Sequence, residues 1–181
     1  MTTKTKRFEV PSLDNVSEQN RNILSAIKEK VGMVPNIYAT YALSDTALER
    51  YTSFSNGKTS FNNKEKEVIN LIVSQVNGCT YCLAAHSAIG KMNGFTDEQI
   101  ISLRKGTAPF NDKFDALVKT AKEISENKGK VSDETLDQFF DAGYTNESFV
   151  DLIVNVGEKT ITNFLHNATK IPVDFPEAPK L

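Results

Sequence analysis

Apolar residues recur along most of this chain at intervals of three and four positions, the spacing that places side chains on one face of an α-helix. Long runs that alternate apolar and polar residues, as half-buried β-strands do, are absent from the sequence. The helical pattern is clear in two apolar stripes, at Ile23, Leu24, Ile27 and Val31, and at Phe114, Leu117, Val118, Ala121 and Ile124. The pattern therefore predicts an all-α protein built as a multi-helical bundle.

Start and stop signals divide this pattern into separate helices. Glycine or Asn-Gly, which commonly ends a helix, follows most of the apolar stripes, and Thr96 with Gln99 is a capping-box pattern. Asn63, ahead of a charged run, is expected to begin another helix. Residues 171–181 contain Pro172, Pro176 and Pro179 and are expected to form an extended C-terminal arm. The helices are expected near residues 17–31, 36–43, 45–57, 64–77, 80–92, 97–105, 111–127, 133–142 and 146–168.

Length and charge restrict the class of protein further. The 181 residues fit a single helical domain over 1–181, because one hydrophobic core commonly serves about 100–200 residues. The formal net charge is −2 and the basic residues are dispersed, which argues against nucleic-acid binding. No apolar run approaches the roughly 20 residues that span a bilayer, and the polar start Met1–Arg7 lacks the apolar core of a signal peptide. We therefore expect a cytoplasmic protein that binds neither nucleic acid nor a membrane.

The two cysteines of the chain, Cys79 and Cys82, carry the most informative pattern. A disulfide between positions so close would stabilise the fold little, so in a reducing compartment the pair indicates redox chemistry or metal binding. Glu67 precedes the cysteines and His86 follows them, in the spacing E-x11-C-x2-C-x3-H. This motif core covers about residues 60–95 and contains the candidate catalytic residues.

The spacing of the motif brings its side chains to one place. Gly78 is expected to end one helix and the cysteines to begin the next, where free amide groups and the helix dipole favour a thiolate. On that helix Cys79, Cys82 and His86 share a face, and His86 lies one turn beyond Cys82, where it can accept the thiol proton. Glu67 lies about 16 Å before Gly78 and His86 about 12 Å beyond it. If the two helices fold back on each other, Glu67 can therefore orient the imidazole.

These residues resemble the core of alkylhydroperoxidase D and of the wider carboxymuconolactone decarboxylase-like superfamily, in particular its peroxidase-related branch. The segment Gly32-Met-Val-Pro35-Asn36, which precedes a helix, is also similar to that branch. The resemblance covers about residues 20–170, and its specific part is the Glu67-to-His86 motif. It implies an all-α fold of the alkylhydroperoxidase D-like type and reduction of hydroperoxides through a disulfide cycle.

The resemblance also implies a role for each residue of the motif. By motif position, Cys82 is the peroxidatic cysteine, Cys79 the resolving cysteine, His86 the base and Glu67 the carboxylate of the proton relay. Alkylhydroperoxidase D has a histidine immediately before its second cysteine, where this chain has Tyr81, so one relay member is missing or replaced by a phenol. The implied cycle requires a hydroperoxide substrate and an external dithiol reductant. Cys79 and Cys82 should then lie close enough to bond without backbone movement.

The resemblance further implies a homo-oligomer built from trimers, so we expect a trimer or a hexamer. Two aromatic clusters, Phe139-Phe140 and Tyr38 with Tyr41, are expected to lie in the core or in such an interface.

Three other interpretations stay open. The same cysteine pair could serve a general disulfide reductase, or the chain could be a non-catalytic oligomeric binding protein. Two thiolates, an imidazole and a carboxylate could also hold zinc, although three ligands on one short helix face leave little freedom for a tetrahedron. A c-type haem site is excluded because Leu83, rather than histidine, follows Cys82. No bound organic cofactor is expected, since the sequence has no G-x-G-x-x-G or P-loop pattern.

Overall fold

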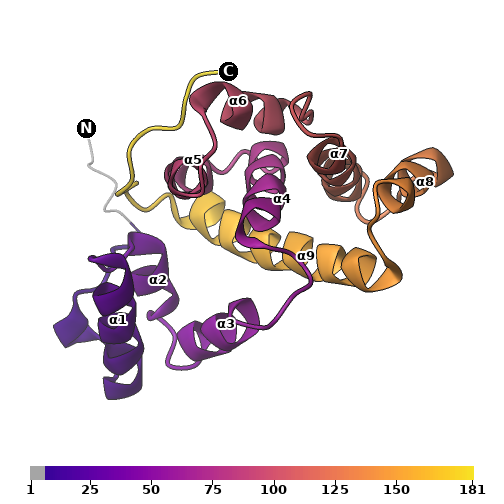
Figure 1. Cartoon of the computed structure of the whole chain (residues 1–181). Coiled ribbons are helices and arrows are strands. Elements are labelled where there is room, and N and C mark those ends of the chain that lie inside the picture. The colour runs from indigo at the N-terminus through magenta and orange to yellow at the C-terminus, as the bar shows by residue number, and fades with distance from the viewer. Residues whose placement is uncertain (1–6) are drawn as a thin grey trace. The chain divides into compact units, whose positions relative to one another are not determined.

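The computed structural model describes residues 7–181, so the polar start from Met1 to Lys6 lies outside the described residues. Every regular element in the described part is a helix, which confirms the predicted all-α fold (Figure 1). A short 3-10 helix, η1, covers Leu13–Asn15, and nine α-helices lie within residues 7–181. They are α1 (Glu18–Val31), α2 (Asn36–Tyr41), α3 (Ala47–Ser55), α4 (Asn63–Val76), α5 (Thr80–Met92), α6 (Asp97–Lys105), α7 (Asp112–Glu126), α8 (Asp133–Asp141) and α9 (Asn146–Thr169).

Local capping sets many of these bounds, which is why the predicted ranges agree with them closely. Thr96 and Gln99 form the expected capping box at α6, with the Gln99 backbone N–H donating to Thr96 Oγ1 at 3.2 Å. At α4 the N-cap is Asn62 rather than the expected Asn63. The side chain of Asn62 accepts from the Glu65 backbone N–H at 3.0 Å, and the Glu65 carboxylate accepts from the Asn62 backbone N–H at 3.0 Å. Glu65, three positions after Asn62, therefore fixes where α4 begins.

The described chain divides into two compact units. The first comprises residues 7–57 and 165–174 and contains η1, α1, α2 and α3. Within it, the buried Asn20 amide of α1 donates to the carbonyl oxygens of Ala42 at 3.2 Å and Ser44 at 3.0 Å. The carboxylate of Asp174 accepts from the Asn36 backbone N–H at 2.6 Å, at the first turn of α2. The expectation of one domain over residues 1–181 stays a prediction.

The second unit comprises residues 58–164 and 175–181, and α4 lies at its centre. Helix α4 contacts α5, α6 and α7, and α8 packs against α7 (Figure 1). The core of this unit is apolar, with α4 contributing Val68, Ile69, Leu71, Ile72 and Val73. Because α4 is surrounded in this way, its polar residues Glu65, Glu67 and Ser74 are buried as well. Each of them needs partners inside the unit.

Residues 170–181, all of which the structure describes, form no helix, as predicted for the C-terminal arm. The last part of the arm belongs to the second unit and packs on it. The Phe175 ring meets the Tyr81 ring edge-on, with 5.7 Å between the ring centroids. The guanidinium of Arg104 donates to the carbonyl oxygen of Pro179, and its Nε donates to Gln75 Oε1 at 2.9 Å. The end of the arm therefore contacts residues of α5 and α6, and Gln75 of α4 holds the Arg104 side chain.

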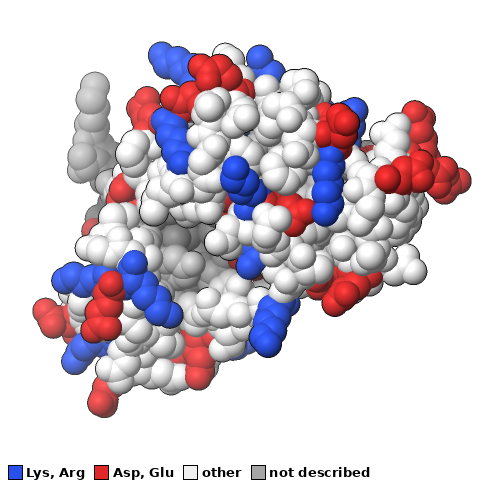
Figure 2. Space-filling model, in the orientation of Figure 1, with Lys and Arg blue, Asp and Glu red and all other residues white. Residues whose placement is uncertain are grey.

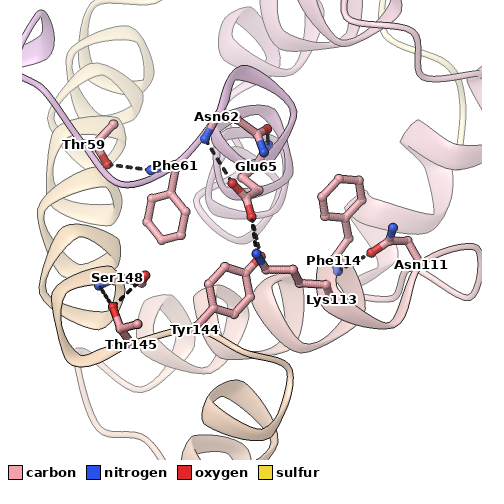
Figure 3. Close-up of polar contacts among 10 residues, drawn as sticks. All are labelled: Thr59, Phe61, Asn62, Glu65, Asn111, Lys113, Phe114, Tyr144, Thr145 and Ser148. Carbon is pink, nitrogen blue, oxygen red and sulfur yellow. Dashed lines mark hydrogen bonds and ion pairs between the residues drawn. The ribbon is translucent and has the colours of Figure 1, made fainter.

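A buried polar cluster joins the start of α4 to α7 and to the turn before α9 (Figure 3). Glu65 is 4% exposed, and its Oε1 accepts from the Tyr144 hydroxyl at 3.0 Å and lies 3.4 Å from Lys113 Nζ. The Lys113 ammonium also lies 4.6 Å from the centroid of the Tyr144 ring. Burial, followed by the negative charge of Glu65, raises the pKa of Tyr144 and keeps its phenol protonated. We call these residues, with the cap residue Asn62, the Glu65 cluster.

Basic and acidic side chains are interspersed over much of the face shown in Figure 2, and acidic side chains gather at its right-hand edge. Among the helices that the structure describes, none is both long enough and apolar enough to span a membrane.

Candidate active site

The junction between α4 and α5 places the two cysteines. Asn77 ends α4, and Gly78 has a φ of +63°, a left-handed conformation that costs glycine little and other residues more. This turn brings the chain back so that the Cys79 backbone N–H donates to the Ser74 carbonyl oxygen at 3.0 Å. Cys79 is then the N-cap of α5, and Cys82 lies in its first turn, as the sequence predicted.

The two sulfur atoms are in contact. Cys79 Sγ lies 2.7 Å from Cys82 Sγ, and both are free thiols. Cys79 Sγ also accepts a hydrogen bond from the Cys82 backbone N–H at 3.3 Å, which caps the helix. The exposed fractions are 0% for Cys79 and 2% for Cys82. A disulfide between these atoms would require only a short movement of the side chains, because its bond length is about 2.05 Å.

Glu67 and His86 meet across the packed pair α4 and α5. His86 Nδ1 lies 2.8 Å from Glu67 Oε2, and the other carboxylate oxygen accepts from the Asn70 amide at 3.1 Å. Burial lowers the pKa of His86, although the negative charge of Glu67 acts to raise it. The imidazole is therefore neutral. Burial works to raise the pKa of Glu67, but the nearby charge of His86, its hydrogen bond and the charge of Lys159 lower it overall. An ionised carboxylate requires the proton on Nδ1, so the lone pair of His86 lies on Nε2.

The two thiols differ in acidity. A hydrogen bond from the Cys79 thiol is the largest cause that lowers the pKa of Cys82 to about 7, and the charge of Lys159 and the amide of Asn163 act in the same direction. The same hydrogen bond, followed by burial, raises the pKa of Cys79. Cys82 is therefore the better thiolate of the two at neutral pH.

The sequence predicted that His86 would take the proton of Cys82 directly, and the structure shows a different contact. Within residues 7–181, the polar partner of the His86 side chain is Glu67, and no hydrogen bond joins Cys82 to His86. The hydrogen bond from Cys79 and the positive charge of Lys159 lower the pKa of Cys82 in its place. His86 Nε2 is thus left to exchange a proton with another group.

Two residues of α9, Lys159 and Asn163, belong to the site and were missed by the sequence analysis. The Asn163 amide donates to Ser74 Oγ at 3.2 Å, and its Oδ1 accepts from the Asn77 amide at 2.9 Å. Lys159 lies one turn earlier on α9 and is 6% exposed. Both residues lie on the same helix face as the buried Val156. Polar residues at helical spacing within an apolar face are a sequence pattern from which they could have been predicted.

The sequence matches a known family over the segment that builds this site. Residues 45–123 match the model of the carboxymuconolactone decarboxylase family, a range that includes α4 and α5. The uncharacterized protein YdfG of Bacillus subtilis (strain 168) is 28% identical over 116 residues, which cover 61% of this chain and 74% of that protein.

Solved structures share the fold over nearly the whole chain. The alkylhydroperoxidase AhpD core of an uncharacterized peroxidase-related protein from Ralstonia eutropha JMP134 is 20% identical, with a TM-score of 0.81 over 90% of this chain and 88% of that one. An uncharacterized peroxidase-related protein from Silicibacter sp. TM1040 is 23% identical, with a TM-score of 0.81 over 95% of each chain. Residues 45–123 are thus similar to the carboxymuconolactone decarboxylase family, and the chain shares the fold of these peroxidase-related proteins. The predicted resemblance and the predicted all-α fold of the alkylhydroperoxidase D-like type are thus confirmed.

Proteins of this fold differ in their chemistry. The debrominase Bmp8, in complex with 2,3,4-tribromopyrrole, is 17% identical to this chain and has a TM-score of 0.75 over 96% of this chain and 93% of that one. At that identity the likeness concerns the fold alone. Function must therefore be argued from the residues of the site.

Tyr81 occupies the position where the motif of this chain departs from that of alkylhydroperoxidase D. The side chain is buried, and its ring packs edge-on against Phe175 of the C-terminal arm. That contact joins the first turn of α5 to the C-terminal arm.

The geometry of the four motif residues does not suit zinc. Two thiolates on one tetrahedral zinc lie about 3.8 Å apart, given Zn–S bonds of about 2.3 Å. The sulfur atoms of Cys79 and Cys82 are 2.7 Å apart, and Glu67 and His86 bind each other. Among the described residues, no group of three or more His, Cys, Asp or Glu side chains is arranged to hold a metal ion.

Proposed function

We propose that the chain is a thiol-dependent peroxidase that reduces hydroperoxides through a dithiol/disulfide cycle of Cys79 and Cys82. The observation that carries the proposal is the pair of buried sulfur atoms, 2.7 Å apart, on a helix that also presents the Glu67–His86 pair. Peroxide reduction by thiols needs a thiolate, a second thiol and a source of protons. Together these four residues offer all three.

In the first step the Cys82 thiolate attacks the terminal oxygen of the hydroperoxide. The S–O bond forms as the O–O bond breaks, so the sulfur is oxidised by two electrons and becomes a sulfenic acid. The remaining oxygen leaves as an alkoxide and takes up a proton to become an alcohol. His86 supports this step because its Nε2 can carry a proton between the site and the leaving oxygen, while Glu67 holds Nδ1.

In the second step the Cys79 thiol attacks the sulfur of the sulfenic acid. A disulfide forms and water leaves, so the oxygen taken from the peroxide ends in water. An external dithiol then reduces the disulfide and restores both thiols. A reducing compartment such as the cytoplasm, where we expect the protein, supplies dithiols of this kind.

The burial of the sulfur atoms favours a small peroxide over a protein disulfide as the substrate. Cys79 is 0% exposed and Cys82 is 2% exposed. A disulfide on another protein could not reach sulfur atoms buried so deeply without opening of the site, whereas a peroxide needs space for few atoms. This distinguishes the proposal from a general disulfide reductase.

We expect the protein to act as a homo-oligomer, a trimer or a hexamer, and an exposed apolar row on α9 supports this. The aromatic residues Tyr41 and Phe139, which the sequence placed in a core or an interface, are buried within the chain. The row on α9 is exposed and consists of Val150, Ile153, Val154, Ile161 and Phe164. At Gly157, between them, an added Cβ would meet nothing within 4 Å, so a second helix has open access to the backbone there. A second copy of this chain is the occupant we propose, and Phe164→Glu should lower the mass measured by light scattering.

The function is tested by peroxide consumption with a dithiol reductant, in the wild type and in Cys82→Ser. The proposal predicts turnover by the wild type, none by Cys82→Ser, and the loss of two titratable thiols per chain when the reduced wild type meets one equivalent of peroxide. A wild type that keeps both thiols in excess peroxide would overturn it. Zinc binding is scored in the same preparation by metal analysis.

A further inference from the structure

Asn163 lies on the face of α9 that contacts the end of α4, and it is fully buried. Its exposed fraction is 0%, as is that of Ser74, one of its partners. An apolar side chain of the same size would avoid the free-energy cost of burying an amide, so a buried amide must be compensated by its hydrogen bonds. The partners of Asn163 therefore indicate what the residue does.

Both ends of the Asn163 amide bind the last turn of α4. Its nitrogen donates to Ser74 Oγ at 3.2 Å, and its Oδ1 accepts from the Asn77 amide at 2.9 Å. The Asn77 amide has a second acceptor on α9, Thr160 Oγ1, at 3.4 Å. One side chain of α9 thus ties together two residues of α4 from which it is separated by 89 and 86 positions of sequence.

Ser74 and Asn77 are the two ends of the turn that leads to Cys79. The Ser74 carbonyl oxygen accepts from the Cys79 backbone N–H at 3.0 Å, and Asn77 is the C-cap of α4. Among the described residues, apart from its chain neighbours, no atom lies within 4 Å of the position that a Cβ at Gly78 would occupy. Packing does not hold the turn in that direction, so the hydrogen bonds from Asn163 gain importance.

The placement of Cys79 decides whether the two sulfur atoms meet. Cys82 lies inside α5, whereas Cys79 is its N-cap and has an extended backbone, with a φ of −86° and a ψ of 98°. The contact of 2.7 Å between the two Sγ atoms therefore depends on where the turn places Cys79. A turn free to move would give Cys79 several positions, and disulfide formation would then pay an entropic cost to select one.

We propose that Asn163 is a positioning residue for Cys79, because by tying Ser74 to Asn77 it fixes the turn before α5 and holds Cys79 Sγ where it can bond to Cys82. The inference concerns the formation of the disulfide and not the first attack on a peroxide. Its link to peroxide chemistry rests on the proposed function, but the disulfide equilibrium can be measured without peroxide.

The test is the reduction potential of the cysteine pair in the wild type and in Asn163→Leu, which keeps the size of the side chain and removes both hydrogen bonds. The protein is equilibrated with glutathione, where the dithiol gives two electrons and two protons to oxidised glutathione, which becomes two molecules of reduced glutathione. We expect the equilibrium constant for disulfide formation to fall about tenfold in Asn163→Leu, which makes the potential about 30 mV less negative. Equal potentials in the wild type and folded Asn163→Leu would overturn the inference.

The sign of the shift separates positioning from an effect on thiol acidity. If Asn163 acted mainly by stabilising a thiolate, its removal would destabilise the reduced pair and make the potential more negative. A more negative potential in Asn163→Leu would therefore overturn the inference as well.

A matched control on the same helix is Asn155→Leu. The Asn155 amide donates to the Asp151 carbonyl oxygen at 2.7 Å and to Thr59 Oγ1 at 3.4 Å, so it ties α9 to the segment before α4. We expect this variant to keep the potential of the wild type. A shift as large as that of Asn163→Leu would show a general effect of loosening α9 and would contradict a specific role for Asn163.

Ser74→Ala removes one of the two bonds and keeps the carbonyl oxygen that binds the Cys79 N–H. We expect the equilibrium constant for disulfide formation to fall about threefold, as for the loss of a single hydrogen bond. This milder variant decides the question if Asn163→Leu does not fold, and an unchanged potential in Ser74→Ala would then overturn the inference.

The failure of the proposed function would look different. A wild type that keeps both thiols in excess peroxide, while Asn163→Leu has the less negative potential, would remove the peroxidase assignment and keep Asn163 as the positioning residue. Peroxide turnover by the wild type, with equal potentials in the wild type and Asn163→Leu, would do the reverse.

Discussion

Two buried carboxylates, Glu65 and Glu67, lie two residues apart on α4 and serve different purposes. Glu65 is 4% exposed and Glu67 is 5% exposed, and each has both carboxylate oxygens occupied. Two residues on a helix are separated by about 200°, so the two side chains point to opposite sides. Glu65 faces α7 and the turn before α9, whereas Glu67 faces α5 and the cysteines.

The difference lies in their partners. Glu65 binds a backbone N–H, a phenol and an ammonium group, none of which changes its charge near neutral pH. Glu67 binds an imidazole, the one side chain whose ordinary pKa lies close to neutral pH. A buried carboxylate thus stabilises the fold when its partners keep their protonation state, and supports proton transfer when its partner can change it. The Glu65 cluster should govern stability, and the Glu67 side of α4 should govern activity.

The largest effect should come from the thiol next to the Glu67–His86 pair. We expect Cys82→Ser to lower the rate of peroxide consumption by about a thousandfold or more, because no other group can take the oxygen. Cys79→Ser should allow the first attack and accumulate a sulfenic acid, which a dimedone adduct detects by mass spectrometry. The free energy of unfolding should change by less than about 1 kcal/mol in both variants. A sulfenic acid on Cys79 in Cys82→Ser would reverse the two roles.

On the other side of α4, Glu65→Ala should affect stability and not activity. It removes the Glu65 half of the capping box of α4 and leaves the buried Tyr144 hydroxyl without its acceptor. We expect the free energy of unfolding to fall by about 3 kcal/mol, measured by urea denaturation. Lys113 contributes little of this, since its side chain is half exposed and its ion pair is screened by water. A loss of peroxide turnover per folded molecule would contradict the separation of the two sides.

For Glu67→Gln we expect the opposite result, a loss of activity with little loss of stability. The amide keeps the shape of the side chain and loses the charge that holds the proton on His86 Nδ1. We expect the rate of peroxide consumption to fall by about tenfold to a hundredfold, the usual cost of losing a carboxylate that orients a functional histidine. The free energy of unfolding should change less than in Glu65→Ala. Equal turnover by the wild type and Glu67→Gln would show that His86 needs no carboxylate.

The pH dependence of stability should also separate the two sides. The folded pKa of His86 lies below its ordinary 6.5, so its contribution to stability is present above pH 6.5 and is lost as the pH falls towards the folded value. The pKa of Glu67 is lowered as well, so its contribution is present above 4.5 and is lost below it. The free energy of unfolding should therefore decrease from neutral pH to about pH 5, and His86→Gln should weaken this dependence.

The smallest expected effect is on stability at alkaline pH. The folded pKa of Tyr144 is raised above its ordinary 10.0, so the unfolded chain loses the phenol proton first and stability falls as the pH rises above 10.0. Tyr144→Phe should remove this decrease and cost about 1 kcal/mol at neutral pH, measured by urea denaturation at both pH values. The acid-side decrease should persist in this variant, since it belongs to the Glu67–His86 pair.

The sequence predicted the helices closely and the site in part. The capping box of Thr96 and Gln99 and the break at Gly78 depend on neighbours within a few residues, so the spacing in the sequence is enough to find them. The contact between Glu67 and His86 could also be predicted from the sequence, because the rise of two helices joined by a turn fixes where their side chains lie. The contact of Asn163 with Ser74 could not be predicted, because the two residues lie 89 positions apart in the sequence.

The sequence by itself determined the all-α fold, the helix ends, and the face of α5 shared by the two cysteines and His86, because each depends on backbone conformation and on contacts a few residues apart. The tertiary structure decided the rest. It placed Tyr144 on Glu65 and not on Glu67, and it turned the buried face of α9 so that Asn163 bonds to Ser74. These choices depend on how whole helices pack, and the free energy of packing is summed over many apolar contacts that no local pattern records.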